Sequence, residues 1–174
     1  MDALTNIYSR ISTRDFSNTP VAEEDIRAIM HAGMAAPVGR GLYDTLHITL
    51  ITKKELLDEI SKAEDYSGAR PNAPLYGAPV LILVSSKLGE KPAIEYSNVG
   101  CVMQTMALAA TAKGLGNIYL WGCIYRLKSH PNIVKKFELP EGFVPISALG
   151  VGYSKTPLET THKPRHVIST NSIR

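Results

Sequence analysis

The sequence predicts a single domain of the α/β or α+β class, in which helices cover a central sheet. Stretches with strand and helix patterns alternate along the chain. Residues 80–84 are an unbroken apolar run, typical of a strand buried on both faces, and residues 97–113 repeat apolar side chains at helical spacing. A chain of 174 residues, 44% hydrophobic and 20% charged, is long enough to bury one proper core.

The first half of the chain supplies five predicted elements. They are a helix at residues 2–9, a helix beginning after Pro20, a loop at 37–44, a strand at 46–52 and a helix at 53–64. The second helix has acidic residues in its first turn, which complement the helix dipole. It should bury Ile26, Ile29 and Met30, and it should end at Gly33 and Pro37.

The second half supplies the strands of the predicted core. The predicted elements are a Gly/Pro-rich connection at residues 67–79, a strand at 80–84, a helix at 97–113, a strand at 117–120, a helix near 128–137 and a strand at 144–151. Gly114 is placed to cap the long helix. Residues 155–174 carry two prolines and no helical period, so we expect an extended arm, which in small proteins often crosses onto a partner subunit.

Composition excludes several classes of function. The net charge is +3 and acidic residues are interspersed, so no basic stripe for nucleic acid is present. The two cysteines, Cys101 and Cys123, lie in apolar stretches and are expected to be buried thiols. The five histidines are scattered, and no metal-ligand spacing emerges. No signal-like segment opens the chain and no 18-residue apolar run occurs, so a cytoplasmic protein is expected.

Two cationic clusters lie at opposite ends of the chain. In an extended segment Arg10, Ser12 and Arg14 point to one side. Pro164 disfavours helix, so Lys163 and Arg165 also project together. Four cations and a hydroxyl suit a phosphate dianion, because arginine presents forked donors. The alternative is that both clusters are simply solvated surface charges.

Two glycine-containing motifs are candidate ligand sites. Residues 114–116 read Gly-Leu-Gly but close a helix and open a strand, the reverse of a dinucleotide fingerprint. Trp121 ends an apolar strand and is most simply a core or interface aromatic. The missing side chain of Gly122 would let a flat ligand lie against the backbone.

These features, in this order, resemble the FMN-dependent nitroreductase family in its short form, over nearly the whole chain. Residues 10–16 resemble the family's R-x-S-x-R-x-F opening, and residues 35–37 the start of its A-P-S-x-x-N-x-Q loop. Residues 98–116 resemble its central helix with a G-L-G exit, residues 149–153 its late strand, and residues 163–165 its K-x-R close. The resemblance implies an α+β, three-layer nitroreductase-like fold, with a mixed or antiparallel sheet and residues 1–174 as one domain.

The resemblance also implies an FMN site at a homodimer interface. One subunit would contribute Arg10, Ile11, Ser12, Arg14, Asn72, Leu120, Trp121, Gly122, Lys163 and Arg165, and its partner Pro37, Val38 and Gly39. Within this set Arg10, Ser12, Lys163 and Arg165 would hold the phosphate and ribityl chain. Arg14 would lie near the pyrimidine edge, and the backbone at Trp121 and Gly122 would face flavin N5.

The implied activity is that of an FMN-dependent NAD(P)H oxidoreductase. Hydride would pass from the nicotinamide to N5 of tightly bound FMN, and then to a nitroaromatic, quinone or activated alkene in a ping-pong cycle. The chain departs from the family at Val38, Gly41 and Tyr43, where the family loop has Ser, Asn and Gln. An FMN-binding protein with a specialised or sensing role and little NAD(P)H turnover is therefore an alternative. A non-enzymatic module that binds an anionic partner is a third.

Overall fold

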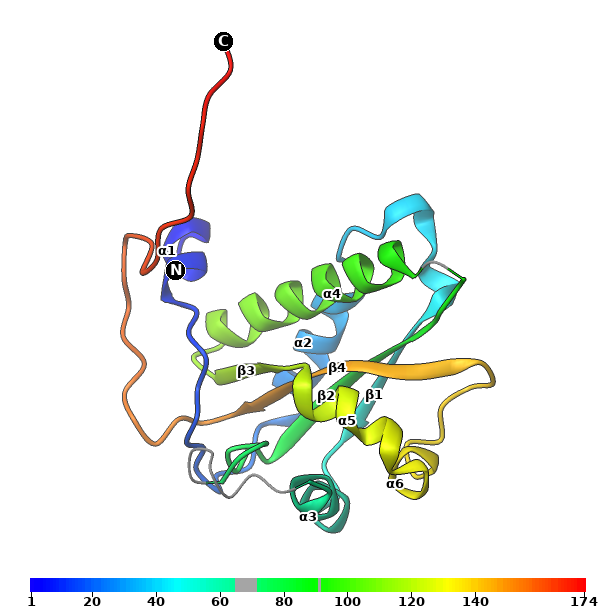
Figure 1. The fold of residues 1–174 in the computed structure, drawn as a ribbon. Coiled ribbons are helices and arrows are strands. Elements are labelled where there is room, and N and C mark those ends of the chain that lie inside the picture. The colour runs from blue at the N-terminus through cyan, green and yellow to red at the C-terminus, as the bar shows by residue number, and fades with distance from the viewer. Residues whose placement is uncertain (65–71, 91) are drawn as a thin grey trace.

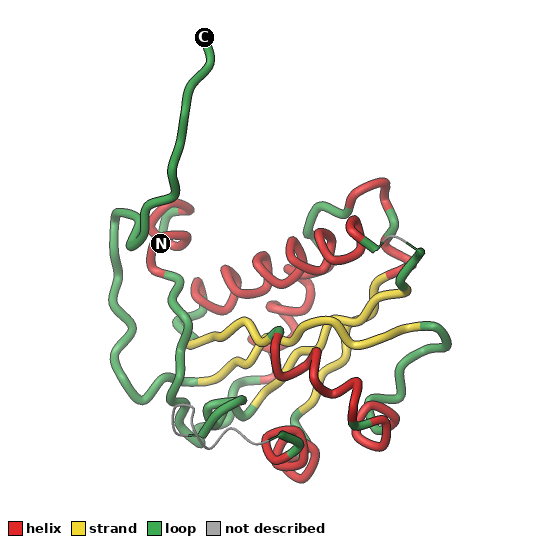
Figure 2. The backbone as a smooth tube through the Cα atoms, in the orientation of Figure 1, coloured by secondary structure: helices red, strands yellow, loops and turns green. Residues whose placement is uncertain are grey.

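The computed structural model describes residues 1–64, 72–90 and 92–174, and these form three layers (Figures 1 and 2). A four-stranded sheet lies between two groups of helices. On one face, α2 (Glu23–Met34) and α4 (Ala93–Ala112) contribute to one hydrophobic cluster. On the other face, α3 (Lys54–Lys62), α5 (Gly122–Arg126) and α6 (Pro131–Lys135) pack on a second cluster. The predicted α+β class with a helix-covered sheet is confirmed.

The sheet is antiparallel throughout. Its strands are β1 (Leu46–Ile51), β2 (Val80–Lys87), β3 (Gly116–Leu120) and β4 (Phe143–Gly152), in the order β1-β2-β4-β3. The two central strands are buried on both faces, as the unbroken apolar run predicts. β2 runs three residues beyond that prediction because buried Ser85 and Ser86 remain paired in the ladder.

The helix predictions are right for the long elements and wrong for one short region. α1 (Ala3–Ser9), α2, α3 and α4 lie where they are predicted, and Gly114 caps α4 with φ +73. Met30 is only partly buried, because the buried face of α2 runs through Ile26, Ile29 and Gly33. The single helix predicted near 128–137 is instead a 3₁₀ turn η3 (Leu127–Ser129) followed by α6. His130, with φ -122 and ψ 64, separates the two, and Pro131 begins α6, where its missing N–H costs no helical hydrogen bond.

Two further segments differ from the sequence-based expectation. α5 was missed, because five residues beginning at a glycine contain too little helical period to detect. The predicted loop at 37–44 contains two 3₁₀ turns, η1 (Gly39–Gly41) and η2 (Tyr43–Thr45). Of the predicted connection at 67–79, residues 67–71 lie outside the described residues.

Residues 155–174 form an arm without helix or strand. The arm passes α1, and its end projects away from the body (Figure 1). Three apolar side chains on it are almost fully exposed, at 97% for Val167, 84% for Ile168 and 94% for Ile173. That the arm crosses to a partner stays a prediction. Within the described ranges, no helix has the length and apolar content needed to cross a membrane.

Gly152 joins the end of β4 to the N-terminal segment and should not tolerate a side chain. A Cβ there would lie 2.6 Å from Pro79 Cδ and 3.0 Å from Phe16 Cδ1, both in stiff rings. We expect Gly152→Ala to lower the free energy of unfolding by roughly 1–3 kcal/mol, as overpacking does. Thermal unfolding of the two proteins measures this, and an unchanged melting temperature would show that Phe16 can move aside freely.

Candidate functional site

The N-terminal cationic segment runs extended beside β3. The Thr13 N–H donates to the Asn117 carbonyl at 2.8 Å, and Ser12 forms a parallel bridge with Asn117. Thr13 is buried over Gly116, where a Cβ would lie only 2.7 Å from Thr13 Oγ1. Glycine at 116 therefore lets the segment approach the sheet closely, and the side chains that alternate with Thr13 face away from it.

The two cationic clusters meet at one cavity of about 520 Å³. Its lining includes Arg10, Ile11, Ser12 and Arg14 from the N-terminal segment and Arg165 from the arm. Burial, and secondly the charge of Arg14, lowers the pKa of the Arg10 guanidinium. No carboxylate lines this cavity within the described part of the chain, although Glu159 Oε2 lies 3.6 Å from Arg165 Nη1. The cavity is therefore suited to an anion.

Contacts between α1 and the arm hold the two clusters together. The Thr161 N–H donates to Ser9 Oγ at 3.0 Å, and Thr5 Oγ1 lies 3.1 Å from His162 Nδ1. Lys163 follows directly but does not line the cavity, and its carbonyl accepts from Thr161 Oγ1 at 3.3 Å. Of the four side chains predicted to hold a phosphate, the structure thus brings together Arg10, Ser12 and Arg165.

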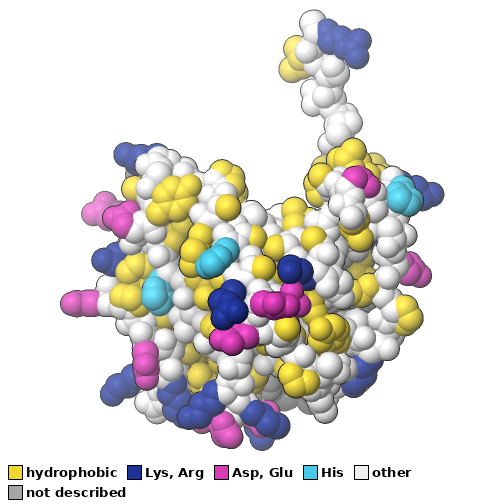
Figure 3. Space-filling view, turned by 180° about the vertical axis from the view of Figure 1, so that it is seen from behind, with side chains coloured by type: hydrophobic (Ala, Val, Ile, Leu, Met, Phe, Trp, Pro, Cys, Tyr) yellow, Lys and Arg dark blue, Asp and Glu magenta, His cyan; other side chains and the backbone are white. Residues whose placement is uncertain are grey.

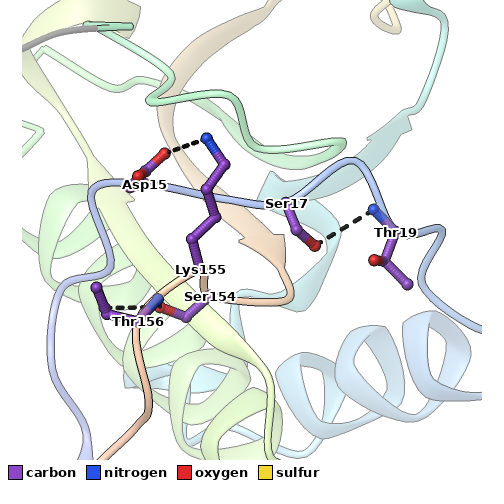
Figure 4. A network of polar contacts seen from close by, with 6 residues as sticks. All are labelled: Asp15, Ser17, Thr19, Ser154, Lys155 and Thr156. Atoms are coloured by element: carbon purple, nitrogen blue, oxygen red, sulfur yellow. Dashed lines mark hydrogen bonds and ion pairs between the residues drawn. The ribbon is translucent and has the colours of Figure 1, made fainter.

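A second set of contacts anchors both cationic segments at a shared point (Figure 4). Lys155 Nζ lies 2.7 Å from Asp15 Oδ1, and the Lys155 N–H donates to the Asp15 carbonyl at 3.1 Å. The Ser17 N–H donates to the Tyr153 carbonyl at 2.8 Å. Because Asp15 directly follows Arg14, and Lys155 begins the arm, these contacts hold the two segments next to each other beside the cavity.

A second cavity, of about 340 Å³, lies at the end of β3. Leu120, Trp121 and Gly122 line it, opposite Pro74 and Tyr76. A Cβ on Gly122 would have no neighbour within 4 Å, so open space lies against this backbone. Trp121 is 52% exposed and stacks on Tyr125 at 5.2 Å, so of the expected core or interface aromatic the core role is wrong, and the interface role stays a prediction.

Asn72 lies at the border of this second cavity. It has φ +59, and the next residue, Ala73, lines the cavity while Asn72 itself does not. The segment is tied to the N-terminal strand, since the Phe16 N–H donates to the Tyr76 carbonyl at 3.2 Å. Trp121, Gly122 and the segment that begins at Asn72 therefore surround the second cavity.

The predicted loop residues Pro37, Val38 and Gly39 lie elsewhere. The Gly39 N–H donates to Asn98 Oδ1 near the start of α4, at 2.8 Å. By contrast, α1 leads into the cationic segment and contacts α4 near its other end. There Asn6 Nδ2 donates a hydrogen bond to the Leu108 carbonyl at 3.0 Å. Ten residues of helix span about 15 Å. None of the three loop residues lines either cavity, so one chain does not bring the loop to the two cavities.

The comparison with protein families decides what kind of chain this is. The model of the nitroreductase family matches residues 7–153. This range includes every residue that lines the second cavity and the residues of the N-terminal segment that line the cationic cavity. The chain belongs to the nitroreductase family. This confirms the resemblance inferred from the sequence motifs.

Relatives of this nitroreductase-family chain are known in both sequence and structure. A protein of Archaeoglobus fulgidus, provisionally named NADH dehydrogenase/NAD(P)H nitroreductase, is 28% identical over 155 residues, covering 88% of this chain and 86% of that protein. The crystal structure of a nitroreductase with bound FMN from Desulfitobacterium hafniense has 27% identity and a TM-score of 0.85, covering 100% of both chains. A nitroreductase with bound FMN from Bacteroides fragilis has 21% identity and a TM-score of 0.78, covering 99% of this chain and 100% of that one.

Three residues that shape the site of this nitroreductase-family chain were missed by sequence reasoning. Thr13 and Asn117 hold the cationic segment against β3, and Asn98 holds the loop. Asn98 is 3% exposed and Asn117 is 2% exposed. A polar amide in an otherwise apolar helix or strand is the signal that could have found them. Among the described residues no three metal-ligating side chains cluster.

Cys123 lines the second cavity, but its thiol should be unreactive toward alkylating reagents at neutral pH. Burial raises the pKa of its thiol to about 11 from a usual value of 9.0. A raised pKa keeps the thiol protonated, so its alkylation rate should keep rising beyond pH 9 instead of levelling there. We expect iodoacetamide to spare Cys123 at pH 8 in a Cys101→Ala background, and to label it after unfolding. Mass spectrometry measures this, and rapid labelling of the folded protein would mean that a nearby group stabilises the thiolate.

Proposed function

We propose that this protein is a homodimeric FMN-dependent oxidoreductase, which uses NAD(P)H to reduce small electrophiles such as nitroaromatics, quinones or activated alkenes. The observation that carries the proposal is the cavity in which Arg10, Ser12, Arg14 and Arg165 converge from both ends of the chain. The FMN bound by the Desulfitobacterium hafniense structure, similar over the full length, supports the identity of the anion.

The side chains fit the phosphate end of FMN. Arg10 and Arg165 would supply charge-assisted donors to the phosphate, and Ser12 a neutral donor beside them. A phosphate dianion would relieve the like-charge interaction of Arg10 with Arg14, to which the lowered pKa of Arg10 is partly due. Lys163 would join this set only if the arm rotates its side chain toward the cavity.

The second cavity fits the ring end. When bound, FMN accepts a hydride from NAD(P)H at N5 and passes one on to the acceptor. Gly122 leaves room for a flat ring, and the backbone at Leu120, Trp121 and Gly122 would orient it. Arg14, which lines the cationic cavity, would hold a positive charge near the pyrimidine edge and so favour added negative charge there. Asn72, whose neighbour Ala73 lines the second cavity, would contact the ring.

A second copy of the chain is needed to bring the loop to the site. The outer side of α4 faces a hollow between the arm and the opposite end of the body (Figure 3). From Tyr96 to Ala112 this helix carries no charged residue, so its outer side suits a helix of the partner. An apolar cavity of about 480 Å³ beside β1, lined in part by Met34, Leu46 and Val102, is a second place for partner contact.

The exposed apolar residues of the arm give a test of the dimer. Each fully buried aliphatic side chain contributes about 1.5–3 kcal/mol, and a symmetric dimer would bury both copies of Val167, Ile168 and Ile173. Removing residues 167–174 keeps Arg165 and should shift sedimentation from dimer toward monomer at micromolar concentration. A truncated protein that dimerises as well as the full chain would mean that the arm does not cross.

Two points complete the proposal. A cytoplasmic location agrees with free thiols at Cys101 and Cys123, which suit a reducing compartment. The specialised or sensing alternative is favoured by the loop, where Val38 and Gly41 offer no polar side chain. In this loop the Tyr43 hydroxyl already donates a hydrogen bond to the Ala36 carbonyl at 3.3 Å.

The deciding experiment is the visible spectrum of the purified protein before and after NADH or NADPH is added without oxygen. A yellow protein that bleaches within seconds supports the reductase. A yellow protein that stays oxidised supports the specialised alternative, because binding is kept and nicotinamide turnover is lost. A colourless protein that FMN cannot reconstitute would overturn both, and binding of other anions that weakens steeply with salt would then support the anion-binding module.

A further inference from the structure

Asn98 is a buried polar residue in the middle of an apolar environment. It lies on α4 between the buried core residues of that helix, and only 3% of it is exposed. Its Oδ1 accepts the Gly39 N–H at 2.8 Å. Because the loop offers a donor, the amide must present its oxygen, which fixes the orientation of the side chain. Asn98 therefore bonds to the loop through one defined atom.

The loop held by Asn98 has little freedom to adopt another shape. A Cβ on Gly39 would lie 3.0 Å from Ile94 Cδ1 and 3.2 Å from Asn98 Oδ1, so the backbone rests directly on α4. The next two residues, Arg40 and Gly41, have left-handed φ values of 60 and 67. Gly39 itself is exposed, so the loop presents an ordered backbone outward from the chain.

The amide nitrogen of Asn98 makes its burial unfavourable. Nδ2 is buried and has no hydrogen-bond partner among the described residues. A buried donor without a partner destabilises a fold, and an aliphatic side chain at this position would avoid that penalty. Residues that are poor choices for stability but well placed for a contact are typical of functional sites.

We propose that Asn98 is a positioning residue for the active site of the partner subunit, acting through the loop at residues 37–41. The inference rests on the proposed function, in which this loop completes the FMN site of the other chain. Each subunit then binds the phosphate with its own Arg10 and Arg165, and its Asn98 orders the loop that covers the ring held by its partner.

The first test compares Asn98→Leu with Asn98→Asp. Leucine fills the space but cannot accept the Gly39 N–H, whereas aspartate keeps an acceptor oxygen. We expect Asn98→Leu to lower kcat/KM for NADH or NADPH about tenfold, the equivalent of one net hydrogen bond. The melting temperature should change little, because the loss of this hydrogen bond is offset by removal of the unpartnered Asn98 Nδ2. Aspartate should restore most of kcat/KM, which a merely structural role would not produce.

The second test is complementation between two defective chains. One chain carries Arg10→Ala with Arg165→Ala, the other carries Asn98→Leu, and different affinity tags allow the mixed dimer to be purified. If Asn98 acts on the partner, one site of the mixed dimer combines an intact cationic cluster with an intact loop. We expect about half of wild-type kcat/KM, since one of two symmetric sites is whole.

The outcomes separate this inference from the proposed function. A wild-type protein without FMN or nicotinamide-driven bleaching removes the proposed function itself. A wild-type protein that bleaches, together with an Asn98→Leu variant of unchanged kcat/KM, removes only the role of Asn98. If the mixed dimer is no more active than one site of the Asn98→Leu homodimer, Asn98 acts within its own chain and the inference fails.

Discussion

Replacing Arg10 and Arg165 together by alanine should abolish flavin binding while leaving the fold intact. Both side chains line the same cavity, Arg10 from beside β3 and Arg165 from the arm. Hydrogen bonds to charged groups contribute about 1.5–3 kcal/mol each, so losing two should raise the Kd for FMN roughly 10²- to 10⁴-fold. Quenching of flavin fluorescence during titration of the apoprotein measures this change.

A matched control separates the site from the overall charge. The double variant lowers the net charge from +3 to +1, and so does Arg27→Ala with Lys54→Ala. Arg27 and Lys54 form exposed ion pairs on α2 and α3, away from the cavity. The control should bind FMN within about twofold of wild type, because surface charges act weakly. If both variants lose FMN equally, the cavity is not the phosphate site.

Lys163 gives a finer version of the same experiment. The sequence places it with Arg165 as a phosphate ligand, but its side chain does not line the cavity. Lys163→Ala should therefore weaken FMN binding less than Arg165→Ala does. Equal effects would mean that the arm brings Lys163 to the phosphate when FMN binds, as order in a mobile terminal segment often follows its ligand.

Gly122→Val should produce a folded protein that cannot hold the flavin ring. Apart from its chain neighbours, no heavy atom lies within 4 Å of the Cβ position, so the valine side chain would extend into the open space above the backbone. Stability should change by about 0.5 kcal/mol or less, as at other surface positions. FMN binding should fall at least 100-fold, because an isoalloxazine ring cannot approach a branched side chain as closely as it approaches glycine.

Gly122→Ala and Ala22→Val make this result interpretable. Alanine adds one methyl group at the same position and should reduce binding by an intermediate amount. Ala22→Val adds a valine at another exposed position, the N-cap of α2, and should leave FMN binding unchanged. Absorbance of the purified proteins and titration with FMN measure all three. Normal binding and turnover by Gly122→Val would place the ring elsewhere.

These two experiments address the two ends of one predicted ligand. The cationic cavity and the cavity at Gly122 are separate spaces, joined by the segment that leads from Arg10 along β3. Gly122→Val, which loses only the ring contact, should still bind inorganic phosphate at the cationic cavity. The double variant Arg10→Ala with Arg165→Ala should not. If both results are obtained, one bound molecule occupies both cavities.

Local sequence patterns were sufficient to predict most of the fold. The run at residues 80–84 has no polar position and is too short for a typical helix, so it indicates a strand buried on both faces, and α4 has enough turns for its period to be clear. Short elements were harder to predict. α5 was missed, and α6 was predicted only as part of a longer helix, because each has five residues and neither contains a full repeat of the helical pattern.

The candidate site was predicted residue by residue, and its sharing between two subunits came from the family resemblance, but the two separate cavities within one chain were not visible in the sequence. The chemistry of the side chains predicts Arg10, Ser12 and Arg165 as phosphate ligands, because arginine supplies forked cationic donors and serine a neutral donor beside them. Their meeting depends on contacts between distant segments, namely Ser9 with Thr161 and Asp15 with Lys155.

By itself the sequence determined the fold class, the family motifs and the types of side chain available for an anion, because all three depend on local order along the chain. Only the tertiary structure decided that the cationic clusters share a cavity and that Asn98 holds the loop away from it, near the other end of α4. Such placements depend on packing between residues far apart in the chain, and no local pattern encodes the distance between them.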